Sequence, residues 1–199
     1  MIKRLFDFII GSILFVLFSP LFLIIGLLIK LDSRGPVFFV QTRLGRGGKE
    51  FAMFKFRTMV ENAQQMGTGL FSYADDPRIT RVGRLLRMVS LDEAPQIINV
   101  LIGNMSLVGP RPPVLNEIGN YDEFSDHMKV RFTVKPGVTG LAQVSGRNEL
   151  NWDQKIEFDN VYVKRYQKWG ILVDMVILIR TFVVVLSMRN IIEKKAESE

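Results

Sequence analysis

Cysteine is absent from the 199-residue sequence, and histidine occurs only once. The lack of cysteine excludes disulfide bonds, thiolate metal sites and thiol nucleophiles, and it is typical of a protein kept in a reducing compartment. The single histidine, His127, has no potential metal ligand at a characteristic spacing, so we interpret it as a surface or structural residue. Zinc clusters and cysteine-based catalysis are therefore excluded.

Acidic residues are in the minority, with 20 Asp and Glu against 26 Lys and Arg, which gives a net charge of +6. A basic chain in which 48% of the residues are apolar is compatible with nucleic acid, an anionic membrane surface or phosphate-bearing substrates as partners. The length accommodates one domain with a substantial core. The distribution of apolar residues decides among these partners.

The N-terminal region contains an uncharged apolar run from Phe8 to Ile29, which is 22 residues long. At about 1.5 Å of rise per residue, such a helix would cover the roughly 30 Å hydrocarbon core of a bilayer. Basic residues lie on both sides of the run, and because such residues prefer the cytoplasm, both ends favour the same side of the membrane. These residues are Lys3, Arg4, Lys30 and Arg34.

Pro20 lies near the middle of the apolar run. It removes one backbone hydrogen bond and clashes with the carbonyl of Val16, while the hydroxyl of Ser19 can satisfy a freed carbonyl. A bent helix that enters and leaves on one side reconciles the kink with the flanking charges. The alternative is a straight signal anchor with a tolerated kink. A cleaved signal peptide is disfavoured because no small-residue cleavage site follows the run.

The remainder of the chain predicts an α+β fold that is mostly helical. Two β-prone runs, Val37–Gln41 and Phe51–Phe56, flank a Gly-containing turn and predict a small hairpin. The apolar run Ile171–Leu186 contains Asp174 and Arg180, each of which is costly at a bilayer centre, so we interpret it as interfacial or core. Further helices are predicted near Met59–Met66, Ile79–Met88, Leu91–Ile102, Val114–Phe124 and Asn151–Gln167.

Four arginines recur at intervals of three residues just before an acidic pair. Steps of three residues drift around a helix, so the set spirals and cannot form one stripe. The run could grip a polyanion, and the alternative is a solvated or membrane-facing helix. The four residues are Arg78, Arg81, Arg84 and Arg87.

The acidic pair Asp92–Glu93 directly follows this basic run, and the juxtaposition points to a metal site or a nucleophile. The alternative is structural, because Ser90 and Glu93 have the spacing of a helix capping box. A helix capped at Ser90 would place Pro95 where its missing N–H is needed. A helix that starts at Asp92 avoids this conflict and sets the carboxylate beside free N–H groups that can bind phosphate.

Two loops carry further phosphate-binding candidates. The segment Gly109–Pro113 holds Arg111 in a proline-rich frame, which lowers the entropy cost of presenting a bidentate donor. The segment Pro136–Arg147 is rich in turn residues and polar donors, and by itself it is a weak signal.

Together these segments resemble the small monotopic phosphoglycosyl transferases, the polyprenyl-phosphate sugar-phosphotransferase family of bacterial glycoconjugate assembly. The resemblance implies a membrane-anchoring re-entrant helix over residues 1–31, broken at Ser19 and Pro20. It also implies a cytoplasmic catalytic domain with interfacial helices over residues 32–199, on the bacterial inner membrane. The matching segments are Lys3–Asp7, Ser19–Pro20, Gly35–Gly45, Phe54–Met59, Asp76–Gln96, Asn104–Pro112, Lys135–Arg147 and Tyr162.

The resemblance further implies the chemistry. Asp92 would attack the β-phosphorus of a UDP-sugar, expel UMP and hold the sugar phosphate covalently until polyprenyl (undecaprenyl) phosphate collects it. Asp92 and Glu93 would bind Mg²⁺, with Glu93 acting as ligand or base. This reaction is the first membrane step of polysaccharide or glycoprotein assembly, and the resemblance leaves the sugar, the pathway and the oligomeric state open.

Substrate-binding residues also follow from the resemblance. Basic residues at motif positions would clamp phosphate oxygens, and Pro112 lies beside one of them. The clamp residues are Lys55, Arg87 and Arg111, with Arg57 and Arg147 as second choices. The sequence departs from the family pattern at Pro113 and Val161, so the sugar specificity of another member cannot be carried over.

Two alternative functions compete with this reading. A glycosyltransferase or multispan transferase that moves a sugar without its phosphate should need more spanning segments or a nucleotide-binding α/β domain. A basic membrane adaptor or nucleic-acid-binding protein is supported by charge alone, and no nucleic-acid-reading motif is present. We therefore expect membrane lipids as partners, and no nucleic acid.

Overall fold

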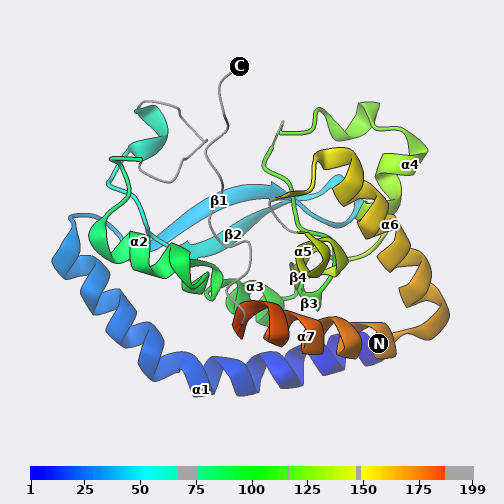
Figure 1. The fold of residues 1–199 in the computed structure, drawn as a ribbon, viewed down its shortest axis with the longest axis horizontal. Helices are drawn as coiled ribbons and strands as arrows, with labels where there is room; N and C mark the ends of the chain where they lie inside the picture. Colours follow the sequence, from blue (N-terminus) through cyan, green and yellow to red (C-terminus); the bar gives the residue numbers. More distant parts are fainter. Residues whose placement is uncertain (67–75, 116, 147–148, 187–199) are drawn as a thin grey trace.

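The computed structural model describes residues 1–66, 76–115, 117–146 and 149–186. This part of the chain is mostly helical with a small hairpin and one long N-terminal apolar helix, which confirms that part of the predicted fold (Figure 1). The helices and strands are α1 Ile2–Asp32, β1 Phe38–Leu44, β2 Glu50–Phe56, α2 Arg81–Met88, α3 Gln96–Ile102, β3 Ser106–Val108, α4 Asp126–Lys129, β4 Gly137–Thr139, α5 Leu141–Ser145, α6 Trp152–Trp169 and α7 Ile171–Leu186.

The predicted hairpin is confirmed. β1 and β2 pair antiparallel, with Phe38 opposite Phe56 and Leu44 opposite Glu50. The turn between them contains a short 3-10 segment at Arg46–Gly48. Gly47 and Gly48 have positive φ angles there, which glycine adopts without a steric penalty. Strand β2 of this hairpin carries Lys55.

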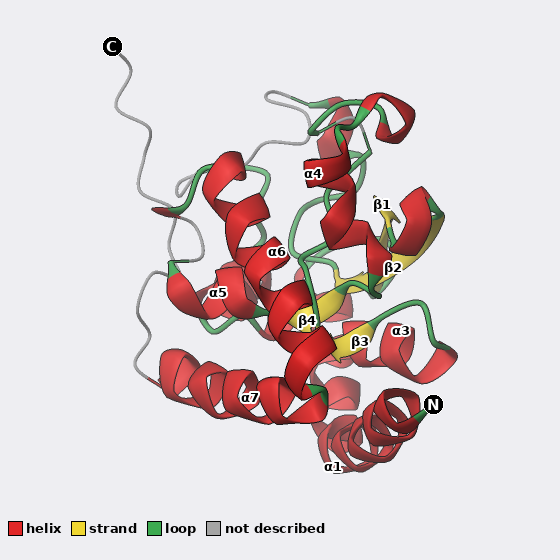
Figure 2. Cartoon of the chain, turned by 90° about the vertical axis from the view of Figure 1, so that its right-hand side faces the viewer, coloured by secondary structure: helices red, strands yellow, loops and turns green. Residues whose placement is uncertain are grey.

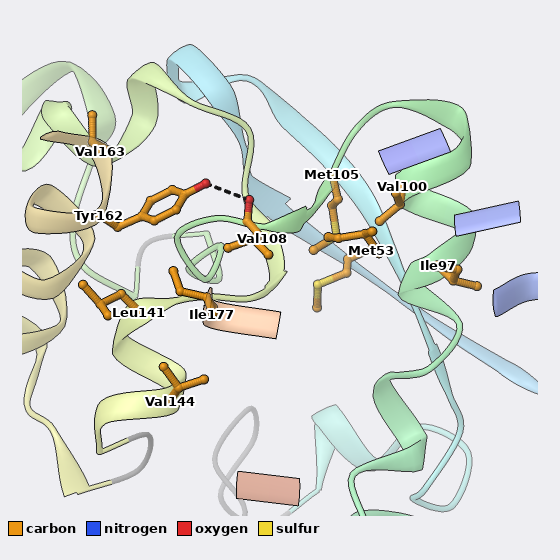
Figure 3. Close-up of a cluster of buried hydrophobic side chains, with 11 residues drawn as sticks. Met53, Ile97, Val100, Met105, Val108, Leu141, Val144, Tyr162, Val163 and Ile177 are labelled. Atoms are coloured by element: carbon orange, nitrogen blue, oxygen red, sulfur yellow. Dashed lines mark hydrogen bonds between the residues drawn. The ribbon is translucent and has the colours of Figure 1, made fainter. Parts of the chain in front are cut away.

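A second pair of strands was not predicted from the sequence. β3 and β4 are three residues each and pair parallel, with Ser106 opposite Gly137 and Val108 opposite Thr139. They lie against the main buried cluster, which includes Met53, Val100 and Met105 (Figure 3). Tyr162 from α6 donates a hydrogen bond of 3.1 Å to the Val108 carbonyl in this cluster. The core therefore joins α3, α6 and both strand pairs.

Helix α1 continues through Pro20 instead of ending there. The hydroxyl of Ser19 donates to the carbonyl of Val16 over 2.8 Å, so it satisfies the carbonyl that the proline leaves without its backbone donor. Figure 1 shows that the helix axis turns near its middle. The predicted local effect of Ser19 and Pro20 is therefore present.

The N-terminal end of α1 is tied to the rest of the chain by polar contacts. Lys3 forms an ion pair of 2.5 Å with Asp174 of α7, and its ammonium also donates to the Val108 carbonyl. Asp7, which is 2% exposed, accepts hydrogen bonds from the Ser106 hydroxyl and the Leu107 amide.

The C-terminal end of α1 is tied to the same body. Asp32 accepts a hydrogen bond of 2.9 Å from the amide of Val82 in α2. The guanidinium of Arg57 donates to the carbonyls of Ile29 and Ser33. Both ends of the helix are therefore bound by one folded unit.

Helices α1 and α7 lie side by side on one face of the molecule (Figures 1 and 2). Both expose large apolar side chains, among them Leu17, Leu23, Ile179 and Phe182. Asp174 of α7 is turned inward and is fully buried, which agrees with the prediction that this helix is interfacial or core. Within the described ranges, α1 alone is long and apolar enough to cross a membrane.

Three helix predictions need correction. Residues Met59–Met66 form turns and a short 3-10 helix, because Asn62 has a left-handed φ of 60°. The described residues of Val114–Phe124 form no α-helix: the range begins with a β-bridge from Val114 to Arg43, Gly119 has a φ of 99°, and only a 3-10 turn follows at Tyr121–Glu123. The predicted helix Leu91–Ile102 is divided, with a 3-10 turn at Leu91–Glu93 and α3 starting at Gln96.

Candidate active site

The acidic pair lies in the short 3-10 turn that precedes α3. Ser90 has a left-handed φ of 57° and makes no capping hydrogen bond through its side chain, so the capping box is not formed. Pro95 precedes α3, where its missing N–H does not interrupt the helix. The prediction that the helix starts at Asp92 is wrong, because α3 begins at Gln96. Asp92 and Glu93 lie in the 3-10 turn before it.

Glu93 is bound by two cations from distant parts of the chain. Arg111 donates to both of its carboxylate oxygens over 2.9 and 2.5 Å, and Lys55 donates over 3.0 Å. Burial alone would raise the pKa of Glu93, but the charges of Arg111 and Lys55 outweigh it and hold the pKa well below its usual range. Glu93 is therefore an ionised carboxylate that is paired with two cations.

Asp92 is in a different electrostatic situation from Glu93. Burial and the neighbouring Glu93 charge raise the pKa of Asp92 to about 6, against the opposing effect of Lys55, Arg87 and Arg111. Among the residues that the structure describes, none forms a hydrogen bond or ion pair with its carboxylate. The two adjacent carboxylates thus differ in pKa and in their hydrogen-bonding partners, a pattern typical of acid–base or nucleophilic pairs.

Lys55 is positioned by the packing of β2 against α3. The side chain of Asn99, which is fully buried, accepts from the Phe54 amide over 3.0 Å and donates to the Ala52 carbonyl over 2.7 Å. Burial lowers the pKa of Lys55, and the Glu93 charge partly offsets this effect. The strand and the turn with Glu93 are therefore held in register by α3.

The arginine run has divided roles, as its spiral spacing predicts. Arg78 is buried and pairs with Asp76 over 2.6 Å, whereas Arg81 and Arg84 are exposed. Arg87 donates to the Thr58 hydroxyl over 2.9 Å, and its charge lowers the pKa of Asp92. Of the four, only Arg87 is among the charges that shift the pKa of Asp92.

The other predicted binding residues are Arg57, Pro112 and Arg147, and the two that the structure describes make their hydrogen bonds away from the acidic pair. Arg57 is 5% exposed and binds carbonyls at the C-terminus of α1, so the geometry favours a structural role over phosphate binding. The carbonyl of Pro112 accepts a hydrogen bond of 2.9 Å from Arg43. Arg147 lies outside the described residues. His127 is a surface residue, as predicted, and its ring contacts Glu157 over 2.8 Å.

Sequence reasoning missed three residues that support Arg111. Arg43 binds the Pro112 carbonyl, and Arg131 binds the Arg111 carbonyl over 2.7 Å. Arg131 is itself paired with Asp159 of α6 over 2.8 Å, and both side chains are buried. No local pattern distinguishes these residues, because their partners are 20 to 69 positions away.

The donor set is suited to a magnesium ion that also binds phosphate. Mg²⁺ is commonly held by one or two carboxylates together with substrate phosphates and waters. Asp92 and Glu93 supply two adjacent carboxylates, and no group of three or more potential metal ligands occurs within the described ranges. Two carboxylates together with substrate phosphates fit this mode of magnesium binding.

Comparison with known proteins places the chain among sugar transferases. The family described as bacterial sugar transferase matches residues 1–188. The chain is 41% identical over 199 residues to the undecaprenyl-phosphate galactose phosphotransferase of Salmonella typhimurium, covering 93% of this chain and 40% of that protein. It is 40% identical over 195 residues to the exopolysaccharide production protein ExoY of Rhizobium meliloti, covering 91% and 84%.

Coverage differs among these relatives. An uncharacterized sugar transferase of Haemophilus influenzae is 40% identical over 200 residues, which are 94% of this chain and 41% of that protein. The chain thus spans about two fifths of the length of the Haemophilus and Salmonella proteins. The predicted resemblance is confirmed across nearly the whole sequence.

Proposed function

This chain belongs to the bacterial sugar transferase family, and we propose that it is a phosphoglycosyl transferase. It would move a sugar 1-phosphate from a UDP-sugar to polyprenyl phosphate, releasing UMP. The observation that carries this proposal is the contrast within the acidic pair. Glu93 is paired with Lys55 and Arg111, while the carboxylate of Asp92 has no hydrogen bond or ion pair within the described residues and has a pKa raised by burial to about 6.

The first half of the reaction uses Asp92 as the nucleophile. A carboxylate oxygen of Asp92 forms a bond to the β-phosphorus of the UDP-sugar, and the bond from that phosphorus to the bridging oxygen breaks. UMP leaves with the bridging oxygen and its electron pair. Lys55, Arg87 and Arg111 would stabilise the charge that develops on the phosphate oxygens.

The second half regenerates the enzyme. A phosphate oxygen of polyprenyl phosphate attacks the same phosphorus, and the bond to the Asp92 oxygen breaks. The products are polyprenyl-diphosphate-sugar and the free carboxylate. Dividing the transfer into two displacements lets one site handle a soluble donor and a lipid acceptor in turn.

Magnesium would be held by Asp92 and Glu93 together with substrate phosphates. When bound, the ion would offset the diphosphate charge and favour departure of UMP. Glu93 remains available for this task because a carboxylate has about four lone-pair sites, and its contacts in the structure are three hydrogen bonds from Arg111 and Lys55.

The bend of α1 and its polar contacts support a proposal for how the chain meets the membrane. α1 bends near Pro20, and polar contacts bind both its ends to one body. We propose that this helix enters and leaves on one face, so that the molecule is monotopic on the cytoplasmic side of the inner membrane. The exposed apolar side chains of α1 and α7 would then lie in the lipid.

Release of UMP tests the proposed activity. We expect purified protein with Mg²⁺ and polyprenyl phosphate to release UMP from at least one member of a UDP-sugar panel. Release of UDP would instead indicate a glycosyltransferase that moves the sugar without its phosphate. If neither nucleotide forms with any donor, the proposed function is wrong.

Cysteine labelling tests the membrane arrangement, because the chain has no native cysteine. We expect single cysteines at Ile2 and Lys49 to resist an impermeant reagent in intact cells and to react after the cells are permeabilised. Replacing Ser19 and Pro20 with alanine should favour a straight spanning helix by restoring the helical hydrogen bond. Labelling at Ile2 but not at Lys49 in intact cells of the unmutated background would show that the helix spans.

A further inference from the structure

The segment Gly109–Pro113, which presents Arg111, has few backbone N–H groups through which the fold can fix it. Pro110, Pro112 and Pro113 lack backbone N–H groups, so the segment can donate little to its surroundings. Its carbonyl oxygens are therefore the main hydrogen-bonding groups through which the fold can fix its position.

Four consecutive carbonyls of this segment each accept a hydrogen bond. Two donors are backbone amides and two are buried guanidinium groups. The donors are the Gly137 amide to Pro110 over 2.9 Å, Arg131 to Arg111 over 2.7 Å, Arg43 to Pro112 over 2.9 Å, and the Leu44 amide to Pro113 over 3.2 Å.

Both guanidinium groups are themselves fixed. Arg131 is 2% exposed and donates to Asp159 through Nε over 3.0 Å. Arg43 is 8% exposed and donates to Gln41 through Nε and Nη2 over 3.1 and 2.7 Å. A donor held in this way restricts the carbonyl that it binds more than a mobile side chain would.

Placing two buried cations beside Arg111 is costly. Burial and the charge of Arg111 lower the pKa of Arg43 to about 10. A neutral donor could satisfy either carbonyl without this penalty.

We propose that Arg43 and Arg131 are positioning residues that hold consecutive carbonyls on the Arg111 segment and so aim the Arg111 guanidinium at the phosphate site. This inference rests on the proposed function of Arg111 as a phosphate donor. Arg43 and Arg131 act through Arg111 and do not touch the substrate. Their importance should therefore vanish when the Arg111 side chain is removed.

A double-mutant cycle tests this dependence. We expect Arg43→Met to lower kcat/KM roughly tenfold to a hundredfold in the wild-type background, as expected for small misplacements of a catalytic donor. In the Arg111→Ala background the same change should lower kcat/KM by less than about threefold. Arg43→Lys should restore part of the loss, because lysine can still donate once to the Pro112 carbonyl.

Arg131 needs a paired variant, since removing it alone leaves Asp159 as an uncompensated buried charge. Exchanging both residues for apolar ones of similar size, as Arg131→Met with Asp159→Leu, retains packing. This double variant should lower kcat/KM in the wild-type background and should lower it much less in the Arg111→Ala background. The matched control is Arg4→Met, because Arg4 also binds carbonyls, those of Val100 and Leu101, on a different segment. Arg4→Met should change kcat/KM by the same factor in the wild-type and Arg111→Ala backgrounds.

A binding measurement separates this inference from the proposed function. The affinity for inorganic diphosphate is measured by calorimetry for each protein of the same double-mutant cycle. Wild-type protein that binds diphosphate but releases no UMP would contradict the proposed activity, and the binding cycle alone would then decide the role of Arg43. Equal losses with and without Arg111, in proteins with unchanged thermal unfolding, would overturn the inference. Failure of the wild type to bind diphosphate would overturn it as well.

Discussion

Replacing Asp92 with asparagine should abolish turnover while the protein stays folded and membrane-bound. The amide cannot act as the nucleophile, so we expect kcat to fall by a factor on the order of 10,000 or more. The change is almost isosteric, and no hydrogen bond or ion pair to the Asp92 carboxylate is lost in the described part of the structure. Thermal unfolding should therefore change little, and UMP release is the measurement that separates the two effects.

The covalent intermediate should be directly observable. Protein quenched with a UDP-sugar, in the absence of lipid acceptor, should carry a sugar phosphate on the peptide that contains Asp92. Mass spectrometry of Asp92→Asn treated in the same way should find no adduct. Asp122→Asn is a matched control, because Asp122 is exposed in a separate 3-10 turn, and it should react like the wild type. An active Asp92→Asn enzyme, or an adduct on another residue, would contradict the mechanism.

Local sequence patterns predicted the helices and strands that are formed by residues close together in the sequence. The hairpin follows from β-prone runs around a glycine turn, and α6 matches the helix predicted near Asn151–Gln167. The patterns failed where backbone conformation overrides propensity. The left-handed residues Asn62 and Ser90 end or prevent helices that side-chain periodicity favours.

Long-range pairing was beyond the reach of these patterns. β3 and β4 are three-residue strands from separate parts of the chain, and such short runs have no distinctive period. The buried pair of Arg131 and Asp159 is formed by helical residues 28 positions apart. Nothing in the sequence marks either residue as buried, because isolated charges are usually exposed.

The candidate site was predictable in part. Lys55, Glu93 and Arg111 come from a strand, a turn and a proline-rich loop, and the family resemblance anticipated that they share one site. The structure brings these three side chains into direct contact. It uses Arg57 elsewhere, at the end of α1. A basic residue in a motif can therefore serve the fold, and only the spatial arrangement distinguishes it from a phosphate-binding residue.

Arg111 offers the most direct test of the phosphate clamp, because it can be removed without leaving its partner uncompensated. Glu93 also binds Lys55 over 3.0 Å, so Arg111→Ala still leaves this half-buried carboxylate with a cation. Glu93→Gln, in contrast, would leave two cations without their anion, and breaking a buried pair in this way commonly costs about 3 to 5 kcal/mol. Activity lost in Glu93→Gln would therefore mix folding with catalysis.

We expect Arg111→Ala to lower kcat/KM roughly tenfold to a hundredfold with folding intact, which matches about 1.5 to 3 kcal/mol for a charge-assisted phosphate contact. The Arg111 side chain is 40% exposed, against 15% for Lys55 and Glu93, so a soluble donor can reach it. Arg111→Lys should fall between alanine and the wild type, because lysine keeps the charge but not the two-pronged geometry. Arg84→Ala, at an exposed arginine of α2, should have wild-type kinetics. Wild-type kcat/KM in Arg111→Ala would remove Arg111 from the clamp, since its contact with Glu93 would then serve only to balance a buried charge.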